Sequence, residues 1–145
     1  MPRYWSLTAN PKVYNVRKAL ADGEREFYWT SKKAKMGPGD GVVIWKAKGK
    51  EETRGVVALG EVLEPPVEME LPDDEYWTFP MEKGREPRVK IRVVLPPSLP
   101  LWVENDTSGV LRSLAVSRAT GGTVHKVTSQ QWRALLDAVG GWPRA

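Results

Sequence analysis

Four consecutive apolar residues, Val42-Val43-Ile44-Trp45, constrain the fold of this chain more than any other feature. Segment 36–41, rich in glycine with one proline, precedes them and has the composition of a turn. An apolar run of this kind after a turn is typical of a strand that is buried on both faces. The polar segment 46–54 predicts a hairpin loop, after which 55–63 pairs back as the next strand. We therefore expect segment 42–45 to lie at the centre of a sheet.

The first thirty residues predict a strand, a short helix and a second extended segment. In residues 3–8 the apolar and polar side chains alternate, which places Trp5, Leu7 and Ala9 on one face of a strand. Asn10-Pro11 then predicts a helix start, with Asn10 as its N-cap. Asp22-Gly23 ends this helix, and residues 26–30 are extended.

Later segments complete the predicted architecture. Gly60 within its strand indicates a bulge or the close approach of another group. Segments 89–95 and 124–127 are further strands, and Thr128 with Gln131 forms a capping box before the closing helix. The sequence predicts an α+β fold, a curved, mostly antiparallel β-barrel of about 5–6 strands with 2–3 helices. A length of 145 residues fits one domain with one core, residues 1–145.

Residues 64–86 are rich in proline and acids and predict a long surface loop. Loops of this length in small domains are often binding loops. Tyr76 and Trp77 lie in its middle, where the sequence gives aromatic residues no obvious core role.

Composition narrows the classes of function. Lysine and arginine number 22 against 18 acids, a net charge of +4 that is compatible with a polyanionic partner. The chain has no cysteine, and no apolar run approaches the roughly 18 residues of a membrane span, so we expect a cytoplasmic protein. His125 is the one histidine, and no set of ligands surrounds it, so we expect neither a metal nor a cofactor. No nucleophile and base are placed together, which favours a binding protein over an enzyme.

Groups that suit a nucleobase gather near residue 10 and residue 30. Asn10 offers one amide donor and acceptor, and Trp29 offers a flat face for stacking. Hydroxyls and lysines suit phosphates. The alternative is an ordinary strand, helix and strand whose aromatics belong to the core. Our interpretation is one side of a pocket for a flat polar ring, with the hydroxyl residues Thr8, Thr30 and Ser31 at its edge.

The chain resembles the EVE domain in several segments that occur in the same order. They are Tyr4-Trp5-Ser6-Leu7-Thr8-Ala9-Asn10-Pro11, Gly39-Asp40 before an apolar strand, Arg54 to Val62, and Leu114-Ala115-Val116. This family belongs to the PUA-like superfamily and is similar to the YTH domains, which read methylated adenine in RNA. The resemblance implies a PUA-like barrel with an aromatic pocket for a base.

By position, the resemblance gives each candidate residue a role. Asn10 corresponds to the amide that bonds the base edge, and Trp29-Thr30 to a cage wall with a hydroxyl or backbone contact. Trp77 falls near the second cage wall, although Trp45 remains open as its alternative. For the nucleic-acid backbone the candidates are Lys32, Lys33, Arg118 and Lys126.

The leading hypothesis is therefore a reader of a modified base in DNA or RNA, acting as a monomer. Two alternatives stay open. One is a general RNA-binding PUA-like module without preference for modification. The other is a sensor that binds a nucleoside or another small molecule in the same pocket.

Overall fold

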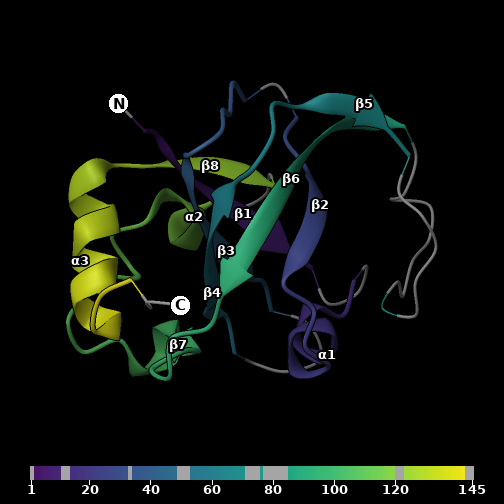
Figure 1. Cartoon of the computed structure of the whole chain (residues 1–145). Coiled ribbons are helices and arrows are strands. Elements are labelled where there is room, and N and C mark those ends of the chain that lie inside the picture. Colours follow the sequence, from purple (N-terminus) through teal and green to yellow (C-terminus); the bar gives the residue numbers. More distant parts are fainter. Residues whose placement is uncertain are drawn as a thin grey trace.

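The computed structural model describes residues 2–10, 14–32, 34–48, 53–70, 76, 85–119 and 123–142. Within these ranges one curled sheet carries the helices around it (Figure 1). Its strands are β1 Tyr4–Ala9, β2 Glu26–Thr30, β3 Gly41–Lys46, β4 Gly55–Val62, β5 Val67–Met69, β6 Glu86–Val94, β7 Leu101–Trp102 and β8 Val124–Val127. The helices are α1 Val16–Ala21, the 3₁₀ helix η2 Val103–Asn105, α2 Ala115–Arg118 and α3 Ser129–Val139.

The sheet is mixed and has two ends. Its strand order is β2-β6-β4-β3-β1-β8, with β5 added on β6 and β7 on β4. The pair β1–β3 is parallel, and the other pairs are antiparallel. Within the described residues β2 and β8 do not pair with each other, so the curled sheet is a half-barrel with an open side. This confirms the α+β, PUA-like barrel, while the two short strands β5 and β7 were not predicted.

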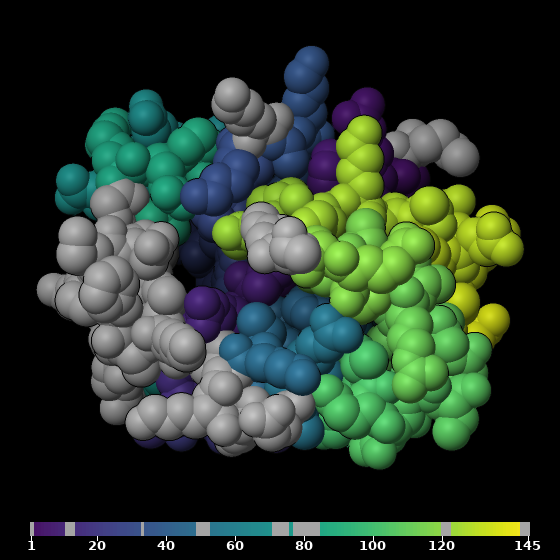
Figure 2. All heavy atoms as spheres, turned by 180° about the vertical axis from the view of Figure 1, so that it is seen from behind, coloured from purple at the N-terminus to yellow at the C-terminus, as the bar shows by residue number. Residues whose placement is uncertain are grey.

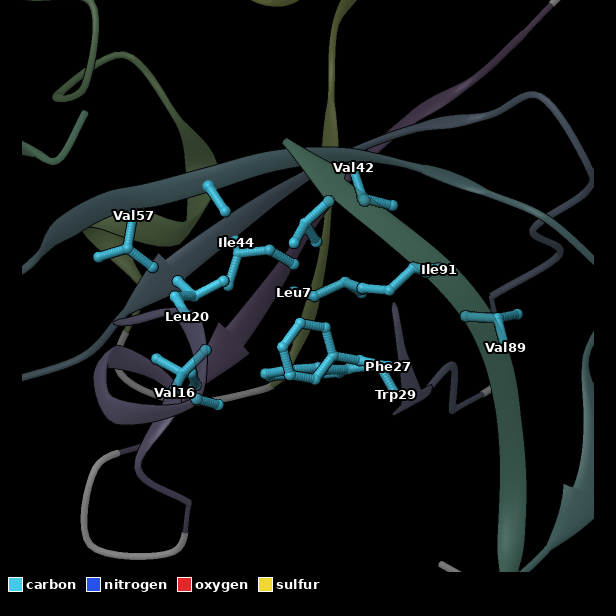
Figure 3. Packing of buried hydrophobic residues seen from close by; sticks show 14 of the residues in the cluster. Leu7, Val16, Leu20, Phe27, Trp29, Val42, Ile44, Val57, Val89 and Ile91 are labelled. Atoms are coloured by element: carbon cyan, nitrogen blue, oxygen red, sulfur yellow. The ribbon is translucent and has the colours of Figure 1, made fainter. Parts of the chain in front are cut away.

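The central strand is the one that the apolar run predicts. All six residues of β3 are buried, between β1 on one side and β4 on the other. Alternate residues enter two different cores. Val42 and Ile44 belong to an inner cluster that also contains residues of β1, α1 and β2, and Figure 3 shows its packing. Val43 and Trp45 belong to an outer cluster with Trp132 and Leu135 of α3.

Two local features fix the shape of the sheet. Gly60 lies so close to β6 that a Cβ atom there would be 2.5 Å from the carbonyl oxygen of Arg92, which confirms the predicted close approach. The buried carboxylate of Asp40 accepts hydrogen bonds from the backbone N–H groups of Arg3 and Gly37 and from the indole N–H of Trp5. It therefore fastens the turn before β3 to the start of β1.

The helix ends are partly as predicted. Thr128 caps α3, and the capping box with Gln131 is present in both directions. The first helix differs, because α1 begins at Val16 and its cap is Asn15, whose side chain accepts a hydrogen bond from the backbone N–H of Lys18 at 3.1 Å. The predicted cap Asn10 is wrong. Its carbonyl oxygen instead accepts a hydrogen bond from the backbone N–H of Tyr14, at 2.9 Å.

Candidate nucleic-acid interface

Trp29 lies at the end of β2 within a group of aromatic rings. Its ring centroid is 6.2 Å from that of Tyr14 and 6.1 Å from that of Phe27, and both contacts are edge-to-face. Tyr14 also meets Tyr76, at 6.0 Å. Trp29 is 8% exposed and belongs to the inner cluster. Trp45, the alternative cage wall, is 2% exposed and lies in the outer cluster.

Tyr76 ties the long loop to α1. Its carbonyl oxygen accepts a hydrogen bond from the backbone N–H of Asn15 at 2.7 Å, and its hydroxyl donates to Asp22 at 3.0 Å. Lys18 also donates to Asp22, and the bonds from Lys18 and then Tyr76 lower the pKa of that carboxylate. Tyr76 is buried in the inner cluster, so the sequence-based view that it has no core role is wrong. The next residue, Trp77, lies outside the described residues.

The three hydroxyl residues of the predicted pocket have different surroundings. Thr30 is half-buried, and its oxygen accepts a hydrogen bond from the backbone N–H of Lys32 at 3.4 Å. Ser31 is fully buried, and its Oγ has no hydrogen-bond partner in the described part of the chain. The Oγ1 of Thr8 is likewise buried and unpaired there, but Thr8 alternates with Leu7 and Ala9 of the inner cluster. Thr8 therefore faces the other side of β1 from Trp29's cluster.

Asn10 follows β1 directly and is exposed. The preceding residue, Ala9, is held in the sheet, because its carbonyl oxygen accepts a hydrogen bond from the backbone N–H of Ala47 at 3.0 Å. Tyr14 connects the two candidate residues, because its backbone N–H donates to the carbonyl oxygen of Asn10 and its ring contacts Trp29. Tyr14 was not among the residues predicted for the site. The signal available for it was its position between the Asn10 turn and the helix, where an aromatic residue can reach the following strand.

Cations lie on both edges of the open side. Lys126 is an exposed residue of β8 and alternates with His125, which places it on the same face as Val124 of the inner cluster. Among the described residues it forms no salt bridge. Lys32 follows β2, is exposed, and has its Nζ 3.8 Å from a carboxylate oxygen of Glu86. Arg118 ends α2 and donates to the carbonyl oxygen of Ser113, and Lys33 lies outside the described residues.

The basic residues along β6 have acidic partners instead. Arg88 is 3.7 Å from Glu86, Lys90 is 3.4 Å from Glu26, and Arg92 is 2.9 Å from Glu61. Hydrogen bonding to Glu26 raises the pKa of Lys90, and hydrogen bonding to Glu61 raises that of Arg92. Since acidic residues already balance these charges, β6 attracts phosphates less strongly than the number of its basic residues indicates.

Figure 2 shows the back of the molecule as seen in Figure 1. Purple atoms of the N-terminal part lie recessed there, between blue atoms of the segment after β2 and yellow-green atoms of the segment that contains α2 and β8. The depression thus lies between the segment that follows β2 and the segment that contains α2 and β8.

The described residues give no support for a metal site or for a membrane-spanning helix. Those residues contain no group of three or more histidine, cysteine or acidic side chains placed to hold a metal ion. Among the same residues, none of the helices is long and apolar enough to cross a membrane.

Comparison with known proteins gives one family and several solved structures with a similar fold. The family model of the EVE domain matches residues 3–138. No curated protein matches the chain. A hypothetical protein from Leishmania major has a similar structure, with a TM-score of 0.65 and 17% identity over 97% of this chain and 96% of that one. A protein from Rhodopseudomonas palustris has a TM-score of 0.62 and 20% identity, over 95% and 93% of the two chains.

One solved structure with this fold contains nucleic acid. Human THYN1 protein in complex with 5-methylcytosine containing DNA has a TM-score of 0.59 to this chain, with 10% identity. The similarity covers 97% of this chain and 99% of the human one. At this level of identity the likeness establishes a shared fold.

Proposed function

The chain belongs to the EVE domain family, and from this membership we propose that it is a non-catalytic nucleic-acid-binding module that reads a modified base, such as a methylated one. The observation that carries the proposal is the position of Trp29 near the end of the edge strand β2, in contact with Tyr14, whose backbone N–H donates to the carbonyl oxygen of Asn10. The complex of human THYN1 protein with 5-methylcytosine containing DNA supports the same class of ligand.

In this proposal the pocket binds an unpaired base by stacking and by edge hydrogen bonds. Trp29 supplies one wall and Trp77 the opposing one, and the Asn10 amide bonds the base edge. Of the three predicted hydroxyl residues, Ser31 lies on the face of Trp29 and Thr30 at the edge of the pocket, whereas Thr8 faces the other side of β1. Stacking on one aromatic ring contributes about 1–3 kcal/mol per base. A methyl group enclosed between rings adds about 0.8 kcal/mol of hydrophobic burial, which gives a preference for the methylated base.

Cations on both edges of the opening would bind the backbone on either side of the base. Lys126 lies on β8, Lys32 follows β2 and Arg118 ends α2, and Lys33 is a further candidate. Lys126 is the best candidate for a phosphate contact, because it is exposed and has no salt-bridge partner in the described ranges. We expect one copy of the chain, residues 1–145 as one domain, to make these contacts in the cytoplasm.

The proposal is tested by changing two buried tryptophans separately. Trp29→Phe keeps an aromatic ring in the inner cluster but removes the indole, and we expect affinity for an oligonucleotide with the preferred base to fall about 10-fold. The matched control is Trp45→Phe, in the outer cluster, which should lower the melting temperature without changing affinity. Fluorescence anisotropy with methylated and unmodified, single- and double-stranded DNA and RNA gives the affinities.

The same panel separates the alternatives. Equal binding of methylated and unmodified RNA would favour a general RNA-binding module. Binding of a free nucleoside with no affinity for any oligonucleotide would favour a small-molecule sensor. A Trp29→Phe protein that binds as well as the parent would show that Trp29 is a core residue only.

A further inference from the structure

The hydroxyl group of Ser31 is buried in a fixed position and lacks a hydrogen-bond partner among the described residues. It is 0% exposed, and its Oγ has no hydrogen-bond partner in the described part of the chain. Its backbone is fixed on both sides, because its N–H donates to the carbonyl oxygen of Pro87 at 3.1 Å and its carbonyl oxygen accepts from Ala34 at 2.9 Å. The next residue, Lys32, has a φ of 51°, so a tight turn follows at once. The position of the hydroxyl is therefore set by the backbone.

The pairing of β2 with β6 determines which way this hydroxyl faces. Trp29 lies opposite Val89 and Thr30 opposite Arg88, and the bond from Ser31 to Pro87 continues the same ladder by one residue. Side chains alternate along an extended segment, so Ser31 lies on the face of Phe27 and Trp29. Those two rings belong to the inner cluster. Ser31 is thus on the inner side of the half-barrel, the next residue after Trp29 on the same face along the chain.

A buried hydroxyl without a partner costs free energy relative to an alanine of nearly the same shape. Such a group calls for an explanation, and a ligand that completes the hydrogen bond is one. The other hydroxyl nearby, that of Thr30, already accepts a bond from the backbone N–H of Lys32. Ser31 therefore has bonding capacity left on the side where the proposed pocket lies.

We propose that Ser31 is a specificity-determining residue, whose hydroxyl bonds the polar edge of the base that enters beside Trp29. This inference rests on the proposed function. A hydroxyl both donates and accepts, so it can bond a ring nitrogen, an amino group or a carbonyl group of the base. It would bond the inner part of the base edge, while the exposed Asn10 would bond the part that faces the opening.

The test compares two buried serines that differ in the face they occupy. Ser6 is 1% exposed, and its Oγ too has no partner in the described ranges, but it alternates with Trp5 and Leu7 and so faces away from the inner cluster. Ser31→Ala and Ser6→Ala each remove one unpaired hydroxyl with little change in volume. We expect both variants, without ligand, to melt at the parent temperature or above it.

Affinity should separate the two variants. For an oligonucleotide with the preferred base, we expect Ser31→Ala to weaken binding about 3- to 10-fold and Ser6→Ala to leave it unchanged. With an abasic site in place of that base, the parent and Ser31→Ala should bind equally.

Three results would overturn the inference. Ser31→Ala that binds the preferred base like the parent, while Trp29→Phe loses affinity, would reject the role of Ser31 and keep the proposed function. Ser31→Ala that melts well below Ser6→Ala would show that the hydroxyl is structural. If the parent binds no oligonucleotide of the panel, the proposed function itself fails, and this inference with it.

Discussion

At the scale of single residues, Asp40 shows how one side chain joins distant parts of the chain. Its carboxylate accepts hydrogen bonds from the backbone N–H of Arg3 at 3.0 Å, the indole N–H of Trp5 at 3.1 Å and the backbone N–H of Gly37 at 3.0 Å. Burial by itself raises the pKa of this group. The three donors together with the charge of Arg3 outweigh burial, so the pKa of Asp40 in the folded protein lies below 3.8.

The lowered pKa predicts how stability depends on pH. Because the folded protein holds the carboxylate in its charged form, the stabilisation by Asp40 is fully present above about pH 4 and is lost as the pH falls through the lower, folded-state pKa. Asp40→Asn should remove this part of the acid sensitivity and cost about 1–3 kcal/mol at pH 7, since one donor loses its acceptor. Urea unfolding at pH 7 and pH 3 measures both effects.

The exposed carboxylate of Asp137 provides the control for Asp40. Asp137→Asn should change the free energy of unfolding at pH 7 by less than about 0.5 kcal/mol. A loss at Asp40 no larger than this would contradict the role given to its three hydrogen bonds.

At the scale of elements, two asparagines near α1 have separate roles. Asn15 caps the helix, so Asn15→Ala should lower the free energy of unfolding by about 1 kcal/mol and leave nucleic-acid affinity near the parent value. Asn10→Ala should weaken the affinity for the preferred base, because the proposed function gives the exposed Asn10 amide the base edge, and its bond to Tyr14 through the backbone carbonyl is kept. Thermal melts and anisotropy on both variants check this, and a loss of affinity for Asn15→Ala alone would exchange their roles.

Elements with strong local signals were predictable. The alternation in residues 3–8, the apolar run 42–45 and the capping box of Thr128 each act over a few residues, and the structure has the element that each predicts. The start of α1 was misplaced because Asn10-Pro11 and Asn15 carry competing cap signals five residues apart. The two short strands β5 and β7 depend on β6 and β4, which lie elsewhere in the sequence, so no local pattern marks them.

At the scale of the whole molecule, charge predicts how binding responds to salt. Each lysine that contacts a phosphate of a single strand contributes about −0.7 to the slope of log affinity against log salt concentration. Lys126→Ala should therefore reduce the slope by about 0.7. Lys90→Ala is the matched control and should leave it unchanged, because Lys90 is paired with Glu26. Affinities measured across a salt series decide, and equal slopes for both variants would remove Lys126 from the interface.

The candidate site was less predictable than the fold. Trp29 and Asn10 were selected from their residue types, but their environments depend on contacts with segments far along the chain. Tyr76 is an example, since its place in the core comes from bonds to Asn15 and Asp22 across more than fifty residues. The balance of charge on β6 is another, because Glu26 and Glu61 meet Lys90 and Arg92 only after the sheet has formed.

The unpaired ends of the sheet have a mechanical consequence. Five strand junctions separate β2 from β8 along the sheet, and a small change of twist at each adds to the next. The width of the opening is therefore a sum over the whole sheet, and its fluctuation is larger than that of any one junction. A nucleic acid that contacts both β2 and β8 would reduce these fluctuations, and binding would then cost conformational entropy of the sheet. Substitutions at distant junctions, such as at Gly60 where β4 meets β6, would then change affinity without touching the ligand.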